Sequence, residues 1–230
     1  MKLLRAISRA GRNRRYWDVQ AREDHRWHIA HARTEDDFAR SGRATAELLF
    51  GPDLERLPHE GDALEIGCGA GRILEHLLPA RPRLRLFGLD VSPEMISRAQ
   101  ARLGRPPNLV LLRGDGRSLD LFPDAALDLV YSALVFQHLP ARLFRRYLGE
   151  AARVLRPGGV LRFQVQYHAR RAGRDRHLPG DFRSIRYHGV DEIRRLTAHD
   201  FEVESHTDPA GRESIHDFLW TLRRRATAPG

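Results

Sequence analysis

The sequence is short of cysteine, of lysine and of long apolar runs. Cys68 is the only cysteine, so intrachain disulfides are excluded, and this favours a cytoplasmic setting. No apolar run approaches the ~18 residues of a membrane-spanning helix. The start, from Met1 to Arg5, has no adequate apolar core for a signal peptide. These absences predict a cytoplasmic protein without a membrane partner.

Lys2 is the only lysine, and all other basic residues are arginine, with a formal net charge of +9. Arginine contacts phosphates well, so a nucleic-acid partner has to be considered. The excess of arginine over lysine is also what codon bias would produce, because alanine, leucine, glycine and proline are abundant in the same sequence. The charge alone is therefore weak evidence for a nucleic-acid partner, which we disfavour but do not exclude.

A chain of 230 residues fits one α/β domain with an appendage. We expect a basic arm and helical lid over residues 1–50, a core over 51–225 and a disordered tail over 226–230. Apolar spacing predicts helices over 14–32 and 34–50, the second opened by a capping box of Thr34 and Asp37.

Two features of this helical segment invite a functional interpretation. Tyr16 and Trp17 are candidate lid residues, although ordinary packing is the favoured role. His25, His28 and His31 recur at helical spacing, but no suitably spaced carboxylate completes a metal site, so we predict none.

The centre of the chain is the stretch from Leu64 to Leu74. An apolar run ends in Gly67, Gly69 and Gly71 and then becomes a helical pattern, which is a strand feeding a helix through a backbone turn. Such a turn is typical of nucleotide binding at the carboxyl edge of a sheet. A dinucleotide fingerprint would need glycine at the position of Arg72, and Glu65 would repel a pyrophosphate but suits a cationic ligand.

Asp90 ends the next predicted strand, 84–90, at 19 residues past Gly71. This spacing is near that of a carboxylate that accepts both ribose hydroxyls. Ser92 and Pro93 then match the N-cap and first residue of a helix. Further strands are predicted over 108–113, 127–132, 160–165, 201–205 and 216–223.

These motifs resemble those of the class I S-adenosylmethionine-dependent methyltransferases. The resemblance rests on Glu-x-Gly-x-Gly-x-Gly from Glu65, on 88–95, on 132–140 and on the Pro-Gly-Gly segment from Pro157. It covers residues 62–165 strongly. It implies an α/β, Rossmann-like, seven-stranded, mostly parallel sheet with helices on both faces and an antiparallel C-terminal strand.

The resemblance also implies the cofactor, S-adenosylmethionine, and the residues that hold it. Glu65 and the glycines would face the methionine part, Asp90 the ribose, and Val91, Met95 and Asp115 the adenine. For Asp115, a plain Asp-Gly turn is the competing interpretation. The implied cofactor-binding set is Glu65, Gly67, Gly69, Gly71, Asp90, Val91, Met95, Asp115, Gly116 and Ser132.

The implied reaction is an in-line displacement at the sulfonium methyl group, to which the protein contributes mainly positioning. A hydroxyl acceptor would need a base, and His138 is the candidate, with Gln137 as an orienting neighbour; a structural role for His138 is slightly favoured. A carboxylate acceptor would need no base.

The acceptor is expected to be a small molecule. The sequence lacks the Asn/Asp-Pro-Pro-aromatic segment of adenine-amino methylation and the paired lysines of ribose 2′-hydroxyl enzymes. Its single cysteine, Cys68, sits in the expected cofactor loop, so a cysteine-dependent cytosine C5 mechanism has no nucleophile. Arg170, Arg171 and Arg174 suggest an anionic acceptor. An RNA methyltransferase and a non-catalytic cofactor-binding domain remain alternatives, and the oligomeric state is left open.

Overall fold

The computed structural model describes residues 9–51, 58–168, 185–207 and 214–226. Seven strands form one sheet in the order β3-β2-β1-β4-β5-β7-β6, and β7 runs antiparallel to both of its neighbours. The strands are β1 (Gly61–Ile66), β2 (Leu84–Asp90), β3 (Leu109–Arg113), β4 (Leu127–Ser132), β5 (Leu155–His168), β6 (Phe201–His206) and β7 (Ser214–Arg224). This arrangement confirms the predicted Rossmann-like fold with its antiparallel C-terminal strand.

The sheet reverses its strand order beside β1. The chain steps outward from β1 through β2 to β3 and then crosses back to place β4 on the other side of β1. In open α/β sheets, ligands bind outside the carboxyl ends of the strands at such a switch point. The topology therefore places the expected site beyond Ile66 and Ser132.

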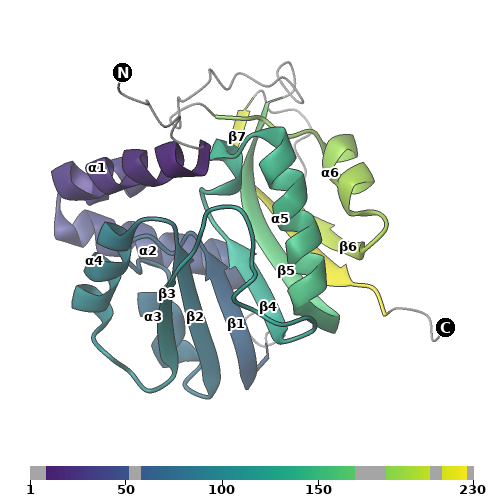
Figure 1. Ribbon diagram of the computed structural model, residues 1–230, viewed down its shortest axis with the longest axis horizontal. Coiled ribbons are helices and arrows are strands. Elements are labelled where there is room, and N and C mark those ends of the chain that lie inside the picture. The colour runs from purple at the N-terminus through teal and green to yellow at the C-terminus, as the bar shows by residue number, and fades with distance from the viewer. Residues whose placement is uncertain (1–8, 52–57, 169–184, 208–213, 227–230) are drawn as a thin grey trace, which may run out of the picture.

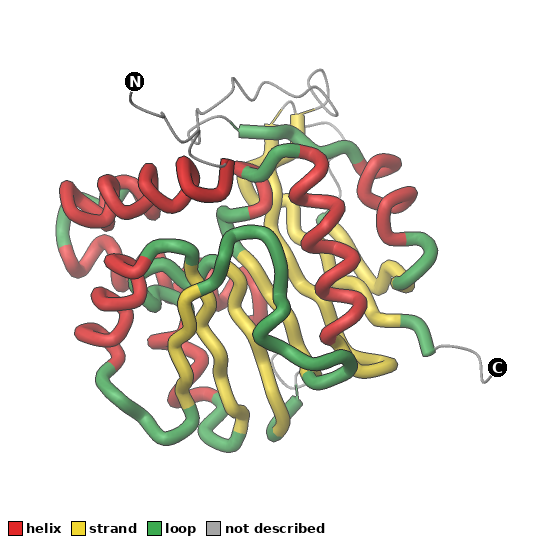
Figure 2. The backbone as a smooth tube through the Cα atoms, in the orientation of Figure 1, coloured by secondary structure: helices red, strands yellow, loops and turns green. Residues whose placement is uncertain are grey.

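Helices cover both faces of the sheet, as predicted. They are α1 (Arg9–Ala30), α2 (Glu35–Phe50), α3 (Leu74–Ala80), α4 (Pro93–Leu103), the 3-10 helix η2 (Phe136–His138), α5 (Ala141–Val154) and α6 (Val190–Thr197). Figure 1 shows α5 and α6 on one face, whereas α1 lies across the end of the sheet at which the parallel strands finish. In Figure 2, the segment that leads into α6 runs along the same end. No helix in the described part of the chain has the length and apolarity of a membrane span.

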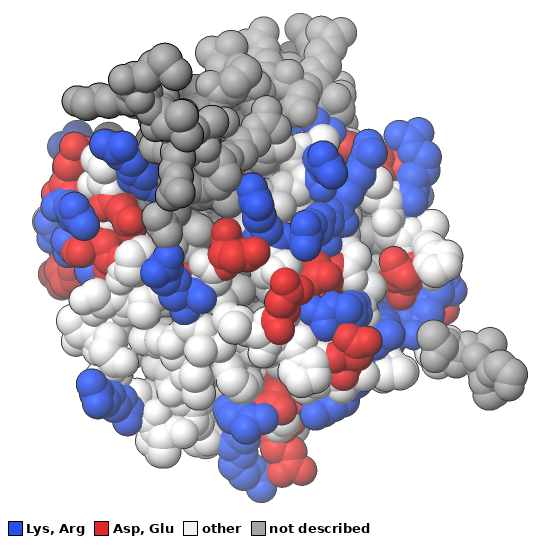
Figure 3. All heavy atoms as spheres, viewed as in Figure 1, with Lys and Arg blue, Asp and Glu red and all other residues white. Residues whose placement is uncertain are grey.

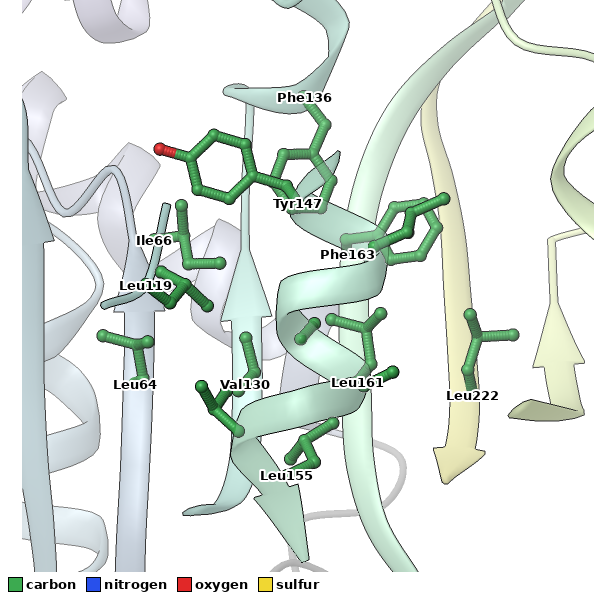
Figure 4. Packing of buried hydrophobic residues seen from close by; sticks show 14 of the residues in the cluster. Leu64, Ile66, Leu119, Val130, Phe136, Tyr147, Leu155, Leu161, Phe163 and Leu222 are labelled. Carbon is green, nitrogen blue, oxygen red and sulfur yellow. The ribbon is translucent and has the colours of Figure 1, made fainter. Parts of the chain in front are cut away.

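Each face of the sheet has its own apolar core. One cluster packs Leu64, Val130, Leu161 and Phe163 against the apolar side of α5 (Figure 4). The other packs the alternate residues of the same strands against α2 and α3. Because side chains alternate along a strand, burial on both faces requires the nearly continuous apolar runs seen in the sequence.

The helical segment before the sheet differs from the prediction at its start. The first helix begins at Arg9 rather than near residue 14, because alanine and arginine are good helix formers and extend it through the expected arm. The second helix has the predicted capping box, in which the Thr34 side chain accepts from the Asp37 N–H and Asp37 accepts from the Thr34 N–H.

The Pro-Gly-Gly segment is part of β5 instead of a turn before it. β5 begins at Leu155, and its register with β4 shifts between the pairs Leu127–Leu155 and Leu129–Val160. Gly158 takes φ +80° inside this irregular stretch. The turn residues thus form an irregular stretch within the strand and do not end it.

Candidate active site

A cavity of about 640 Å³ lies at the carboxyl ends of the central strands. This volume is in the usual range for small-molecule and cofactor sites, about 300–1,000 Å³. Its walls come from the glycine turn, the ends of β1, β2 and β5, the η2 segment and α1. It therefore spans the sheet from the β2 side to the β5 side of the switch point.

The glycine turn forms the floor of the cavity near β1. Gly67 and Gly69 line it with φ values of +74° and +52°, a conformation that L side chains rarely adopt. A Cβ on Gly67 would lie 2.3 Å from a methyl carbon of Val135. The Gly67 and Cys68 N–H groups both donate to the Leu89 carbonyl, at 2.7 and 3.1 Å, which fixes the turn against β2.

Asp90 stands at the end of β2 and lines the cavity, as predicted. Its two carboxylate oxygens accept hydrogen bonds from the Gly69 N–H at 2.9 Å and the Ser92 N–H at 2.8 Å. Burial nevertheless raises the pKa of Asp90 to about 6, and the Asp18 carboxylate contributes to this rise. An ionised carboxylate has about four lone-pair sites, so capacity remains for a ligand hydroxyl.

Glu65 is buried at the end of β1 and also lines the cavity. The Tyr131 hydroxyl donates to it at 3.2 Å. Desolvation raises the pKa of Glu65 to about 8, although the Arg72 guanidinium and this hydrogen bond act in the opposite direction. A buried carboxyl of this kind favours a ligand that brings positive charge, because the cation stabilises its ionised form.

The raised pKa of Glu65 predicts a pH dependence of stability. Its pKa is higher in the folded than in the unfolded protein, so its stabilising contribution is complete below about 4.5 and is lost as the pH rises through about 8. We expect the free energy of unfolding of the ligand-free wild type to fall relative to Glu65→Gln between pH 5 and 8. The relative loss should be on the order of a few kcal/mol. Urea unfolding at both pH values measures it, and a constant difference between the two proteins would contradict the buried carboxyl.

Val91, Met95 and Gly116 also line the cavity, whereas three residues of the predicted cofactor set do not. Gly71 packs against α4, where a Cβ would lie 2.6 Å from Leu103. The Ser132 hydroxyl donates to the Ile66 carbonyl at 2.9 Å inside the sheet. Gly71 and Ser132 therefore support the residues that line the cavity and do not line it themselves.

Asp115 lies between two cavity-lining residues but its own side chain is exposed. Its carboxylate accepts from the Arg117 and Ser118 N–H groups at 2.7 and 2.8 Å and so caps the turn that follows. This matches the Asp-Gly turn interpretation, and the adenine contact stays a prediction.

Arg72 connects the glycine turn to α2. Its guanidinium, buried with the rest of the side chain, donates to the Ser41 carbonyl at 2.6 Å and to the Thr45 hydroxyl at 2.7 Å. Gly42 lets the helix approach, because a Cβ there would lie 2.5 Å from the Arg72 carbonyl oxygen. The glycine inside this helix therefore allows the backbone of α2 to approach the backbone of the glycine turn closely.

Helix α1 covers the mouth of the cavity. Tyr16 and Trp17 line it, and the Trp17 ring meets the His138 ring edge-on with centroids 5.8 Å apart. One residue on, Asp18 accepts from the Ser92 hydroxyl at 2.5 Å, next to Asp90. Sequence reasoning missed Asp18. We propose that the helical part of residues 1–50 acts as the lid predicted for it, held at both ends of the cavity.

The far side of the cavity contains Gln137 and His138, the predicted acceptor-site pair, together with Gln164 and Gln166, which sequence reasoning missed. The Gln137 amide nitrogen lies 3.5 Å from His138 Nε2. Arg170, Arg171 and Arg174 lie outside the described residues. No cluster of potential metal ligands occurs within the described ranges, and the side chains of His25 and His28 are outside them.

Many described arginines form ion pairs with acidic residues across the fold. Arg85 pairs with Asp62, and Arg153 pairs with both Asp124 and Glu150. On the face shown in Figure 3, basic and acidic side chains are interspersed and do not form a continuous basic stripe.

Comparison with known proteins identifies relatives of the central segment. Residues 64–163 match a family model described as a methyltransferase domain. The chain is 36% identical over 144 residues to trans-aconitate 2-methyltransferase of Methylobacterium radiotolerans, covering 60% of this chain and 49% of that protein. It is 35% identical over 132 residues to malonyl-[acyl-carrier protein] O-methyltransferase of Hahella chejuensis, covering 57% and 45%. The chain thus spans about half the length of the curated relatives that it matches.

Solved structures show the same fold. Geranyl diphosphate C-methyltransferase from Streptomyces coelicolor A3(2), in complex with Mg²⁺, geranyl diphosphate and S-adenosyl-L-homocysteine, aligns with a TM-score of 0.70 at 14% identity. The alignment covers 96% of this chain and all of that one. At this identity the likeness concerns the fold alone.

Proposed function

We propose that the chain is a class I S-adenosylmethionine-dependent methyltransferase, as the match of residues 64–163 to a methyltransferase-domain model supports, and that it transfers a methyl group from this cofactor to a small anionic acceptor. The supporting observation is one continuous cavity with two chemically different ends. Glu65 and Asp90 lie at one end, and Gln137 and His138 at the other. The same space can hold a cationic nucleoside and a polar acceptor side by side.

The residues at the cofactor end fit S-adenosylmethionine. The Asp90 carboxylate has capacity for a ribose hydroxyl beyond the backbone N–H groups that it accepts from. Val91 and Met95 supply apolar surface for the adenine, and the buried Glu65 carboxyl suits the positive charge of the methionine part. When bound, the cofactor supplies an activated methyl group, so the chain itself has to position the two reactants and exclude water.

An acid is the acceptor class that the comparisons favour. The relatives named above are named for trans-aconitate and for a malonyl group on acyl-carrier protein. A carboxylate oxygen attacks with its own lone pair, so no general base is required. With an acid, His138 would orient the acceptor and would not remove a proton.

Transfer of radiolabelled methyl groups tests the proposal. The protein is incubated with methyl-labelled S-adenosylmethionine and separately with trans-aconitate, other small organic acids and total RNA. We expect label in a small acid and none in RNA. Label in RNA alone would support the RNA-methyltransferase alternative. Cofactor binding without transfer to any acceptor would support a non-catalytic domain.

A further inference from the structure

The β5 side of the cavity is lined by carboxamides where a buried strand would ordinarily be apolar. β4 pairs with β5 as far as Ser132 and Phe163, and β5 then continues to His168 without it. Leu161, Phe163 and Val165 point into the core beneath α5. Gln164 and Gln166 alternate with them, are 2% and 6% exposed, and line the cavity.

The segment Ile185–His188 takes the place that β4 vacates and fixes this wall. Tyr187 forms a parallel bridge with Gln166, and the His188 N–H donates to the Gln166 carbonyl at 2.9 Å. The Arg186 N–H donates to the Gln137 carbonyl at 2.8 Å. One short segment therefore holds the backbones of two cavity glutamines, which come from η2 and β5.

Gln137 completes the set with a buried amide whose bonding is incomplete. The side chain is 3% exposed, and its Oε1 has no hydrogen-bond partner among the described residues. Its Nε2 lies 3.5 Å from His138 Nε2, which is too long for a strong hydrogen bond. A buried polar group without a partner costs about 1–3 kcal/mol, so a ligand that completes its bonding would recover this energy. Rotation of the Gln137 amide by half a turn would direct either its carbonyl oxygen or its NH₂ group toward a ligand in the cavity.

The described arginine side chains near the β5 side of the cavity are bound to other residues of the fold. The Arg186 guanidinium is buried in an ion pair with Glu192 and does not line the cavity. The Arg72 guanidinium is bound to Ser41 and Thr45 of α2. Within the described part of the cavity, the acceptor end thus offers neutral donors and the His138 ring. Neutral N–H donors hold a carboxylate without neutralising its charge, so the oxygen stays nucleophilic.

We propose that Gln137, Gln164 and Gln166 form a carboxamide subsite that holds a carboxylate of the acceptor beside His138; this deepens the proposed function and rests on it. In the reaction, a lone pair on the carboxylate oxygen forms the new O–CH₃ bond. The S–CH₃ bond breaks with its electron pair moving to sulfur, and no proton is transferred. The methylated carboxyl becomes a neutral ester group, which the N–H donors bind more weakly than the carboxylate.

The test is a calorimetric titration on the full chain saturated with S-adenosylhomocysteine. The probes are trans-aconitate, malonate and dimethyl malonate, the last being a neutral counterpart of the second. The variants are Gln164→Glu, which replaces N–H donors with a negative oxygen, and Gln164→Met and Gln137→Met, which remove the donors without adding charge. Gln100→Glu on α4, outside the cavity, is the matched control.

We expect at least one acid to bind the wild type and the Gln100→Glu control, while dimethyl malonate does not bind. Loss of a charge-assisted hydrogen bond should weaken that acid roughly ten- to a hundredfold in each subsite variant, with S-adenosylhomocysteine affinity unchanged. If Gln164→Glu also fails to bind S-adenosylhomocysteine, we take it to be misfolded, and the test of the subsite then rests on the two methionine variants.

Three results would overturn the subsite: neither acid binds at millimolar concentration, malonate binds but dimethyl malonate binds as tightly, or the methionine variants bind the acid like the wild type. Failure of the wild type to bind S-adenosylhomocysteine would refute the proposed function instead. The two failures are therefore distinguishable.

Discussion

Replacing Asp90 by alanine is expected to weaken S-adenosylmethionine binding at least tenfold. Two ribose hydrogen bonds to a carboxylate are worth roughly 1.5–3 kcal/mol each. The same change also releases the Gly69 and Ser92 N–H groups that the carboxylate holds at 2.9 and 2.8 Å. The effect on affinity therefore combines lost ligand contacts with a loosened glycine turn. Isothermal titration of the cofactor into wild type and variant measures it.

Asp90→Asn should be no milder, because its NH₂ group would have to face one of the two backbone N–H donors. Asp120→Ala, an exposed position outside the cavity, is the control and should leave the affinity unchanged. Near-normal binding by Asp90→Ala would mean that the ribose is not held at the end of β2.

Gly42→Ala should lower the free energy of unfolding by roughly 1–3 kcal/mol through overpacking. A Cβ at this position would lie 2.5 Å from the Arg72 carbonyl oxygen and 2.6 Å from Arg72 Cγ. The backbone of the glycine turn cannot move away, because the Gly67 and Cys68 N–H groups are bound to Leu89. Helix α2 would have to shift, and the bonds from Arg72 to Ser41 and Thr45 would weaken with it.

Gly149→Ala is the matched control, since it is an exposed glycine inside α5 with no atom within 4 Å of the added Cβ. Helix propensity alone should make it more stable by roughly 0.5–1 kcal/mol. Urea unfolding measures both changes in the free energy of unfolding, which should have opposite signs in the two variants. A stabilised Gly42→Ala would show that α2 does not press on the glycine turn.

The cofactor half of the site was predictable because its chemistry is local in sequence. Glu65 lies at the end of one strand, Gly67 and Gly69 follow that strand, and Asp90 ends the next, so strand ends and spacing sufficed to bring them together. The seven-stranded, mostly parallel sheet with its antiparallel C-terminal strand followed from the family resemblance. Gly71 and Ser132 were predicted to bind the cofactor, but their packing against Leu103 and Ile66 depends on tertiary contacts that spacing does not encode.

The acceptor half was predicted only in part. Gln137 and His138 lie in the short helix η2 that comes soon after β4, whereas the role of Gln164 and Gln166 depends on where β4 stops beside β5. The alternation Phe163-Gln164-Val165-Gln166 carried a usable signal, because polar residues in a buried strand need a reason. Asp18 gave no such signal, since a charged residue on a helix usually faces solvent.

Titration of S-adenosylmethionine into the wild-type protein tests the central claim most directly. The account predicts saturable binding of one cofactor per chain, competed by S-adenosylhomocysteine and weakened at least tenfold by Asp90→Ala. No saturable binding at millimolar concentration, or binding that Asp90→Ala leaves intact, would contradict it.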